Sequence, residues 1–187
     1  MAPLAGLIPS RTWIVAAVPF VLCGCATMSG CDDAAAAKTA KVKISGQSFY
    51  LETALEDAKR FRGLSERTNI EPNGGMIFVF RETRSPAYGG FVMRDCPIGI
   101  DILYLDKSGR VVTTYAMVPE AKRDPAKGEG TPADANNPAY NSRLKQYTSR
   151  YPYNFVIELK EGSLEKLKVK EGDQIEFDRD DLLKQAK

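Results

Sequence analysis

The chain has 187 residues, with 26 lysines and arginines, 24 aspartates and glutamates, and no histidine. The net charge of +2 is too small to attract nucleic acid or an acidic surface, so we expect no nucleic-acid partner. Without an imidazole the chain has neither a Ser-His-Asp nor a Cys-His nucleophile, and it lacks the usual zinc ligand.

Residues 1–24 have the pattern of a secretion signal that ends at a lipid-modified cysteine. Arg11 supplies a positive charge, and residues 12–22 are largely apolar. This run is too short for a membrane-spanning helix, which needs about 20 apolar residues. A leucine three residues before Cys25 and a glycine directly before it match the lipoprotein signal. We therefore predict that residues 1–24 are removed and that Cys25 carries the lipid.

The lipid would place the protein in the cell envelope, anchored on the periplasmic side of a bacterial membrane. An ordinary secretion signal cut near Ala26, or an apolar N-terminus with the true start further downstream, is the alternative. Residues 25–40 are small and polar without a periodic apolar face, which predicts a flexible tether. We expect a single domain over residues 41–178 and a charged tail over residues 179–187.

The four cysteines limit metal and disulfide chemistry. Cys23 leaves with the predicted signal and Cys25 is acylated, so Cys31 and Cys96 remain. Two thiols exclude a four-thiolate metal site, and we predict neither a metal nor a cofactor. In an oxidising envelope the two could form a disulfide. We favour unpaired thiols, because Cys31 lies in the predicted tether and disulfide geometry is strict.

Alternating or unbroken apolar runs between turn signals predict a mainly β domain. The predicted strands cover residues 42–44, 49–51, 76–80, 100–105, 111–118, 155–159 and 174–177. Residues 91–93 form a shorter extended piece, and residues 106–109 close a hairpin through a glycine. Strands outnumber helices, so an antiparallel β-sandwich or barrel with one or two short helices is favoured over a doubly wound sheet.

Cap residues mark the short helices. Thr53 and Glu56 have the spacing of a capping box, which predicts a helix over residues 54–62 that stops at Gly63. Asn141 is expected to cap a short basic helix, and Ser163 another helical turn. The charged residues after 178 are expected to form a frayed helix.

Residues 119–139 contain four prolines and two glycines without an apolar period. So long an irregular insertion is either disordered or functional. Tyrosines and basic residues follow it, a mixture suited to sugar rings or a protein partner, or to packing the insertion onto the sheet. They are Tyr140, Tyr147, Tyr151, Tyr153, Arg143, Lys145 and Arg150.

Charged side chains gather between two of the predicted strands, where a ligand could be held. The candidate ligand-binding residues are Arg62, Met93, Arg94, Asp95, Cys96 and Asp101. The alternative is structural: Asp101 accepts backbone N–H bonds or pairs with Arg62 or Arg94. Cys96 is a reactive thiol or, as we favour, a packed inert one. Glu158 and Glu161 are interpreted as solvated surface charge.

Five stretches resemble, in the same order, a bacterial and archaeal family known as domain of unknown function 192 (DUF192). They are residues 60–64 (RFRGL), 75–80 (GMIFVF), 91–98 (FVMRDCPI), 100–106 (IDILYLD) and 172–173 (GD). The resemblance covers about residues 41–178. Where the family usually has Trp and Lys-Asn-Thr, this chain has Val92 and the sequence RDC at 94–96. The resemblance implies a compact, jelly-roll-like β-sandwich with a small helix, and no particular activity.

These observations favour a non-catalytic binding or accessory module of the cell envelope. Its expected partners are the membrane, through the N-terminal lipid, and an envelope protein or glycan. The alternative is an enzyme that acts on envelope carbohydrate with carboxylates such as Asp95 and Asp101. A structural stabiliser of a membrane complex is a third possibility. No catalytic residue can be named from the sequence.

Overall fold

The computed structural model describes residues 38–187. The predicted signal, Cys25, Cys31 and most of the predicted tether lie outside the described residues. The six strands are β1 (Thr39–Ile44), β2 (Gln47–Ala54), β3 (Met76–Arg84), β4 (Ile100–Leu105), β5 (Val111–Met117) and β6 (Tyr153–Lys160). The short helices are α1 (Asp57–Arg62), α2 (Pro138–Asn141), α3 (Ser163–Leu167) and α4 (Arg179–Gln185), with 3₁₀ turns η1 (Pro86–Tyr88) and η2 (Pro125–Lys127). Thr39 and Ala40, predicted to lie in the tether, already belong to β1.

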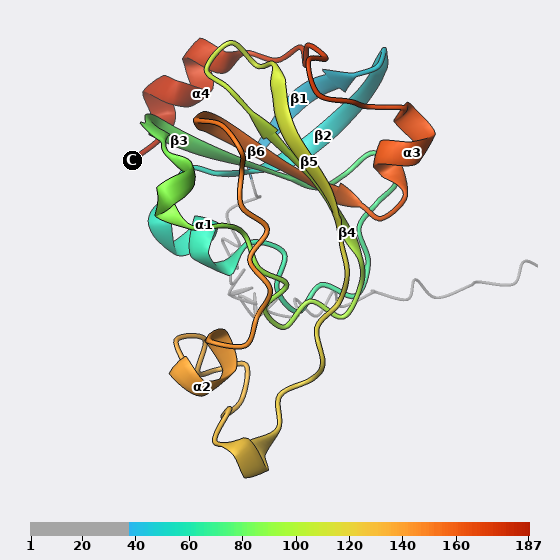
Figure 1. The fold of residues 1–187 in the computed structure, drawn as a ribbon. Coiled ribbons are helices and arrows are strands. Elements are labelled where there is room, and N and C mark those ends of the chain that lie inside the picture. Colours follow the sequence, from blue (N-terminus) through green and yellow to red (C-terminus); the bar gives the residue numbers. More distant parts are fainter. Residues whose placement is uncertain (1–37) are drawn as a thin grey trace, which may run out of the picture. The chain divides into compact units, whose positions relative to one another are not determined.

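The strands form one six-stranded sheet in the order β1-β2-β3-β6-β4-β5 (Figure 1). Neighbouring strands run antiparallel, except that β2 and β3 run parallel and pair Thr53 with Ile77. A parallel pair needs a crossover connection, and α1 with the loop after it supplies one. The described region is therefore a mainly β, single-domain fold with short helices, as predicted. It contains no helix long and apolar enough to cross a membrane.

The predicted strand at residues 174–177 bridges the two edges of this sheet. The Lys43 amide of β1 donates to the Glu176 carbonyl at 2.8 Å, and the Val111 amide of β5 donates to the Asp173 carbonyl at 2.8 Å. The contacts are isolated bridges and do not form a seventh strand in the sheet order. They occupy backbone groups that an exposed sheet edge would leave open to other chains.

Side chains that alternate along the strands build two apolar clusters, one on each face of the sheet. In the central strand β6, Phe155, Ile157 and Leu159 enter the first cluster, which α3 and α4 also cover. Val156 enters the second cluster. Glu158 follows Val156 on the same face, so a carboxyl group lies on an apolar face of the sheet.

The start of α1 differs from the prediction, whereas its end agrees with it. Thr53 still belongs to β2, and its hydroxyl donates to the Lys38 carbonyl at 3.0 Å. The helix therefore begins at Asp57, after Glu56, whose side chain makes no capping hydrogen bond. The predicted capping box is wrong because pairing with β3 extends β2 through Thr53 and Ala54. Gly63 ends the helix with a positive φ of 53°, as predicted.

Two other caps also lie elsewhere than predicted. The basic helix predicted to begin after Asn141 is wrong: the helix found here, α2, ends at Asn141, and Asn137 caps its start by accepting the Tyr140 amide at 2.9 Å. Gly162 precedes α3, and the Ser163 hydroxyl donates to the Lys160 carbonyl at 2.6 Å instead of accepting from the helix. Asn137 and Asn141 are both residues that favour a helix start, so the sequence alone did not decide between them.

The charged C-terminal residues are part of the domain. Asp178 caps α4 by accepting the Asp181 amide at 3.0 Å. Leu182 and Ala186, four residues apart, are buried against the first apolar cluster. The predicted helix after residue 178 is therefore confirmed, but it is not a frayed tail, because an apolar stripe on one side of this charged helix fixes it to the sheet.

Candidate functional site

A cavity of about 570 Å³ lies on the face of the sheet that carries Glu158. Helix α1, residues 88–92 and residues 141–146 contribute to its walls, and β3 and β6 contribute to its base. This volume suits a small organic molecule. Aromatic rings supply much of the apolar lining: Phe61, Phe78, Phe80, Tyr88, Phe91 and Tyr153.

Glu158 is the buried acid of this cavity. Its pairing partners in β3 and β4 are Met76 and Ile102, and it is only 5% exposed. Burial raises its pKa from the ordinary 4.5 to about 8, so the carboxyl is largely protonated at neutral pH. The interpretation of Glu158 as solvated charge is wrong, whereas Glu161 is exposed. Glu158 lies two residues after the apolar Val156, so both face the same side of β6, and this alternation was the signal in the sequence that Glu158 is buried.

Four arginines surround the cavity: Arg60, Arg62, Arg84 and Arg94. Arg60 is held by Asp57, with 2.7 Å between Nη2 and Oδ1, and it also donates to the Leu55 and Val79 carbonyls. Among residues 38–187, the other three have no carboxylate oxygen within 4.0 Å. Arg84 stacks instead on Phe80 and Tyr88, at 5.2 and 5.0 Å from the ring centroids. The lining therefore has an excess of positive charge.

Four buried side-chain atoms in the described region have no hydrogen-bond partner: Arg60 Nε, Arg84 Nε, Asn141 Oδ1 and Glu158 Oε2. All four belong to residues that line this cavity. Buried polar atoms in native proteins are rarely unpaired, because each lost hydrogen bond is costly. Their concentration in one cavity is the pattern expected where a polar ligand supplies the missing partners.

The structure brings only some of the predicted site residues together. Arg62, Arg94 and Cys96 line the cavity. Met93 is completely buried in the second apolar cluster. Asp95 is turned toward the insertion, and Asp101 lies in β4, with its Oδ2 accepting the amide of Leu164 in α3 at 2.7 Å. Asp101 thus makes the backbone contact that the structural alternative allowed, and it pairs with neither Arg62 nor Arg94.

Cys96 borders Glu158 and is buried. Its thiol donates to the Arg94 carbonyl, with 3.4 Å between sulfur and oxygen. Burial is the largest cause that raises its pKa to about 12, and the nearby Glu158 and Asp95 raise it further. The thiol is therefore neutral at physiological pH and is a poor nucleophile.

We expect the native Cys96 thiol to react with iodoacetamide at pH 8 at least about a hundredfold more slowly than in urea, because it is both buried and protonated. Peptide mass spectrometry of time points would assign the label to the peptide that contains Cys96. Similar rates in the folded and denatured protein would show that this thiol is reactive.

The insertion between β5 and β6 is ordered and projects from the sheet (Figure 1). Arg123 holds it to the 94–96 segment, because its Nε and Nη2 each donate to one Asp95 oxygen at 2.8 Å. Its guanidinium also lies 3.9 Å from the centroid of the Tyr140 ring. Arg143 pairs with the buried Glu129 at 2.7 Å. Of the two predicted alternatives, disorder is therefore wrong.

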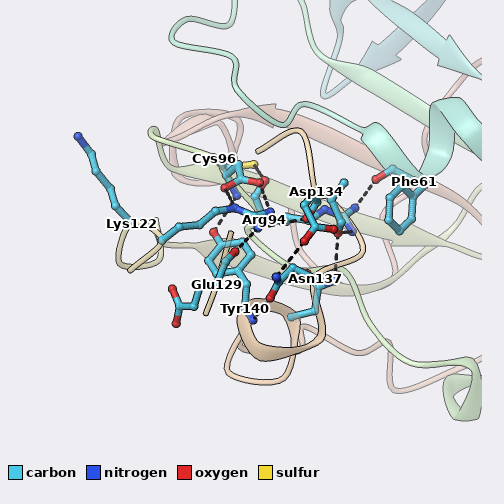
Figure 2. Close-up of polar contacts among 12 residues, drawn as sticks. Phe61, Arg94, Cys96, Lys122, Glu129, Asp134, Asn137 and Tyr140 are labelled. Atoms are coloured by element: carbon cyan, nitrogen blue, oxygen red, sulfur yellow. Dashed lines mark hydrogen bonds and ion pairs between the residues drawn. The ribbon is translucent and has the colours of Figure 1, made fainter. Parts of the chain in front are cut away.

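Arg94 connects this insertion to the cavity. Figure 2 shows its side chain reaching toward Phe61, and it donates to the Phe61 carbonyl and, at 3.5 Å, to the Ala135 carbonyl. Its guanidinium lies 3.8 Å from the centroid of the Phe61 ring. The predicted tyrosine cluster is divided: Tyr140 packs within the insertion, Tyr147 and Tyr153 are buried in the second apolar cluster, and Tyr151 is 56% exposed.

Several cavity residues were missed from the sequence, namely Arg60, Arg84, Asn141, Glu158 and the aromatic residues other than Tyr153. Arg60 lies in the RFRGL motif, which offered a signal, but Arg84 and Asn141 lie in segments without a recognisable pattern. The described region contains no cluster of three or more Cys, Asp or Glu side chains able to hold a metal ion.

Comparison with known proteins gives a family and a fold. Residues 40–177 match DUF192, “Uncharacterized ACR”. A candidate transcription regulator from Sinorhizobium meliloti 1021 is 24% identical over 74% of this chain and 93% of that chain, with a TM-score of 0.56. A protein of unknown function from Novosphingobium aromaticivorans DSM 12444 is 20% identical over 74% and 83%, with a TM-score of 0.52. No curated protein matches. At these identities the two structures share the fold alone.

Proposed function

Because this chain belongs to the DUF192 family, whose fold does not by itself identify an activity, we propose a function on the basis of the cavity. The protein is a binding module for a small organic anion whose remaining surface is apolar or aromatic. The observation that carries this proposal is the gathering of all four unpartnered buried polar atoms of the described region around one cavity. A bound ligand would remove the cost of leaving these atoms unpaired.

The charge of the cavity favours an anion. Arg62, Arg84 and Arg94 have no carboxylate partner among the described residues, and Glu158 is mostly neutral. Guanidinium groups bind carboxylates, phosphates and sulfates with charge-assisted hydrogen bonds. The six aromatic rings favour a ligand whose remaining surface is apolar. An envelope glycan or an envelope protein would meet the same two requirements if it carries a group that has both an acidic function and apolar surface.

A carboxylate-dependent enzyme acting on envelope carbohydrate is the second candidate. Glu158 favours it, because a protonated buried carboxyl in a cavity is suited to donate a proton. Glycoside hydrolysis usually needs two carboxyl groups on either side of the bond. The other acid that lines this cavity is Asp57, which is paired with Arg60, whereas Asp95 and Asp101 do not line it. We therefore favour binding over catalysis.

We expect 1-anilinonaphthalene-8-sulfonate to bind the folded protein with a fluorescence increase, and biphenyl-4-carboxylate to displace it. Biphenyl-4-carboxamide, which is similar in shape but uncharged, should be a weaker competitor. Arg84→Gln should weaken binding of the carboxylate about tenfold, because it removes one charge-assisted contact.

Arg81→Gln is the matched control, since Arg81 is exposed on the same strand and does not line the cavity. Equal effects of the two substitutions, or no preference for the carboxylate over the amide, would contradict an anion site. Release of sugar from peptidoglycan or polysaccharide, lost in Glu158→Gln, would instead support the enzyme.

The envelope location is part of the same proposal and rests on the sequence around Cys25. We expect the mature protein to carry a diacylglyceryl group at Cys25 and to sediment with membranes, and Cys25→Ser to abolish both. Cys31→Ser is the control and should change neither. Intact mass spectrometry and membrane fractionation would measure this. An unmodified N-terminus together with a cytosolic pool would overturn the location without affecting the cavity.

A further inference from the structure

We propose that Glu158 determines which anions the cavity accepts, by donating a hydrogen bond to an uncharged oxygen at the apolar end of the ligand. This inference rests on the proposed function and deepens it. It describes a ligand with two polar ends: an anion that meets the arginines, and a carbonyl or similar neutral acceptor that meets Glu158.

The position of Glu158 supports this role. The residue lies on β6, one of the two central strands of the sheet, and its partners on the neighbouring strands, Met76 and Ile102, are apolar. Its Oε2 is buried and has no hydrogen-bond partner in the protein. A polar side chain that is 5% exposed, unpartnered and part of a cavity wall is suited to a ligand rather than to the fold.

Two polar groups close to Glu158, on Cys96 and Tyr104, already donate their hydrogen bonds to other residues. The Cys96 thiol donates to the Arg94 carbonyl, and the Tyr104 hydroxyl donates to the Tyr147 carbonyl. Tyr153 is buried among aromatic rings of the same cluster. None of these contacts uses the Glu158 carboxyl.

The charged groups of the cavity leave Glu158 neutral. Asp57 and the four arginines Arg60, Arg62, Arg84 and Arg94 line the same cavity. Burial raises the pKa of Glu158, and within residues 38–187 no arginine nitrogen lies within 4.0 Å of its carboxyl oxygens. The protonated carboxyl has one O–H to donate.

The acceptor is best uncharged, for a physical reason. A second anionic group would lose its hydration at the apolar base of the cavity without meeting a cation there. A neutral oxygen loses much less hydration free energy than an anion does, and it gains the hydrogen bond from Glu158. A site that depends on such a bond discriminates strongly against a ligand of the same shape without the oxygen, because the carboxyl is then left unpaired.

The test compares two probes by titration calorimetry with the full mature protein at pH 6.5 and pH 9.5. They are 4′-acetylbiphenyl-4-carboxylate and 4′-isopropylbiphenyl-4-carboxylate, which differ mainly in the acceptor oxygen. We expect the acetyl probe to bind at least tenfold more tightly at pH 6.5. This preference should shrink at pH 9.5, where Glu158 ionises and no longer donates, and both probes should bind more weakly there because each would bury the Glu158 charge.

Two variants separate hydrogen bonding from a structural effect. Glu158→Gln keeps an N–H donor and cannot ionise, so it should retain the acetyl preference at both pH values. Glu158→Leu should abolish the preference at both. Glu161→Gln, an exposed acid just beyond the same strand, should behave as the wild type.

The outcomes distinguish this inference from the proposed function. Equal affinities of the two probes at pH 6.5, or an acetyl preference that Glu158→Leu retains, would overturn the role of Glu158 while leaving an anion site intact. If neither probe binds and the naphthalene sulfonate also fails to bind, the proposed function falls together with the inference. Should Glu158→Leu not fold, the pH dependence of the wild type against Glu158→Gln decides the question alone.

Discussion

Between pH 4.5 and pH 8 the wild-type protein is expected to lose stability as the pH rises, and Glu158→Gln is expected to remove this loss. Burial raises the pKa of Glu158 in the folded state from 4.5 to about 8. Between these values the unfolded chain has released this proton and the folded chain retains it, so raising the pH favours unfolding. The free energy of unfolding should fall by about 1.4 kcal/mol per pH unit, or about 5 kcal/mol in total.

Urea denaturation of both proteins at pH 5, 7 and 9 would measure this effect. The readout is the difference in slope with pH, so any constant cost of burying the glutamine amide cancels. Below about pH 4.5 the Glu158 contribution is constant because both states are protonated, and above about pH 8 it is constant because both are ionised. Glu161→Gln is the control and should keep the wild-type slope. Parallel pH profiles for wild type and Glu158→Gln would show that Glu158 is ionised in the folded protein.

The second large effect is expected from the ion pair between Arg123 and Asp95. Their side chains are 5% and 11% exposed, and the two contacts between them are 2.8 Å long. Arg123→Met leaves the Asp95 carboxylate buried without its partner. Breaking one side of a buried pair is strongly destabilising, so we expect a loss of about 2–3 kcal/mol. The insertion should also become sensitive to proteases, because Arg123 holds it to the 94–96 segment.

Urea denaturation and limited proteolysis would test this prediction. Lys127→Met is the control, since Lys127 forms an exposed pair with Asp124 and should contribute little. Adding Asp95→Asn to Arg123→Met should recover part of the loss, because the buried charge is then removed; asparagine also tolerates the positive φ of 52° at this position. If Arg123→Met is as stable and as protease-resistant as Lys127→Met, the insertion is held by its other contacts.

Local patterns were enough to determine much of this fold. The apolar run at residues 76–80 is part of β3, and the runs at residues 100–105 and 111–118 form the hairpin of β4 and β5, closed at Gly109 with a φ of 84°. Alternation and turn residues act between near neighbours, so they can be interpreted without knowing the rest of the fold. The family motifs likewise pointed to the correct family.

The candidate site was only partly predictable, because its residues come from segments far apart in the chain. Arg62, Arg94 and Cys96 were identified from local charge and motif, whereas Arg84, Asn141 and Glu158 were not. Nothing near Arg84 in the sequence shows that its guanidinium will lack a carboxylate partner. That property depends on which elements pack around it.

The sequence by itself determined the approximate positions of the six sheet strands, the mainly β class, the absence of histidine chemistry and the family. Only the tertiary structure decided that Glu158 is buried, that Asp101 binds the start of α3, and that Arg123 orders the insertion. The physical reason is that burial and the partners of a charge depend on contacts between distant segments, and these contacts decide whether a carboxyl is solvated, paired or neutral.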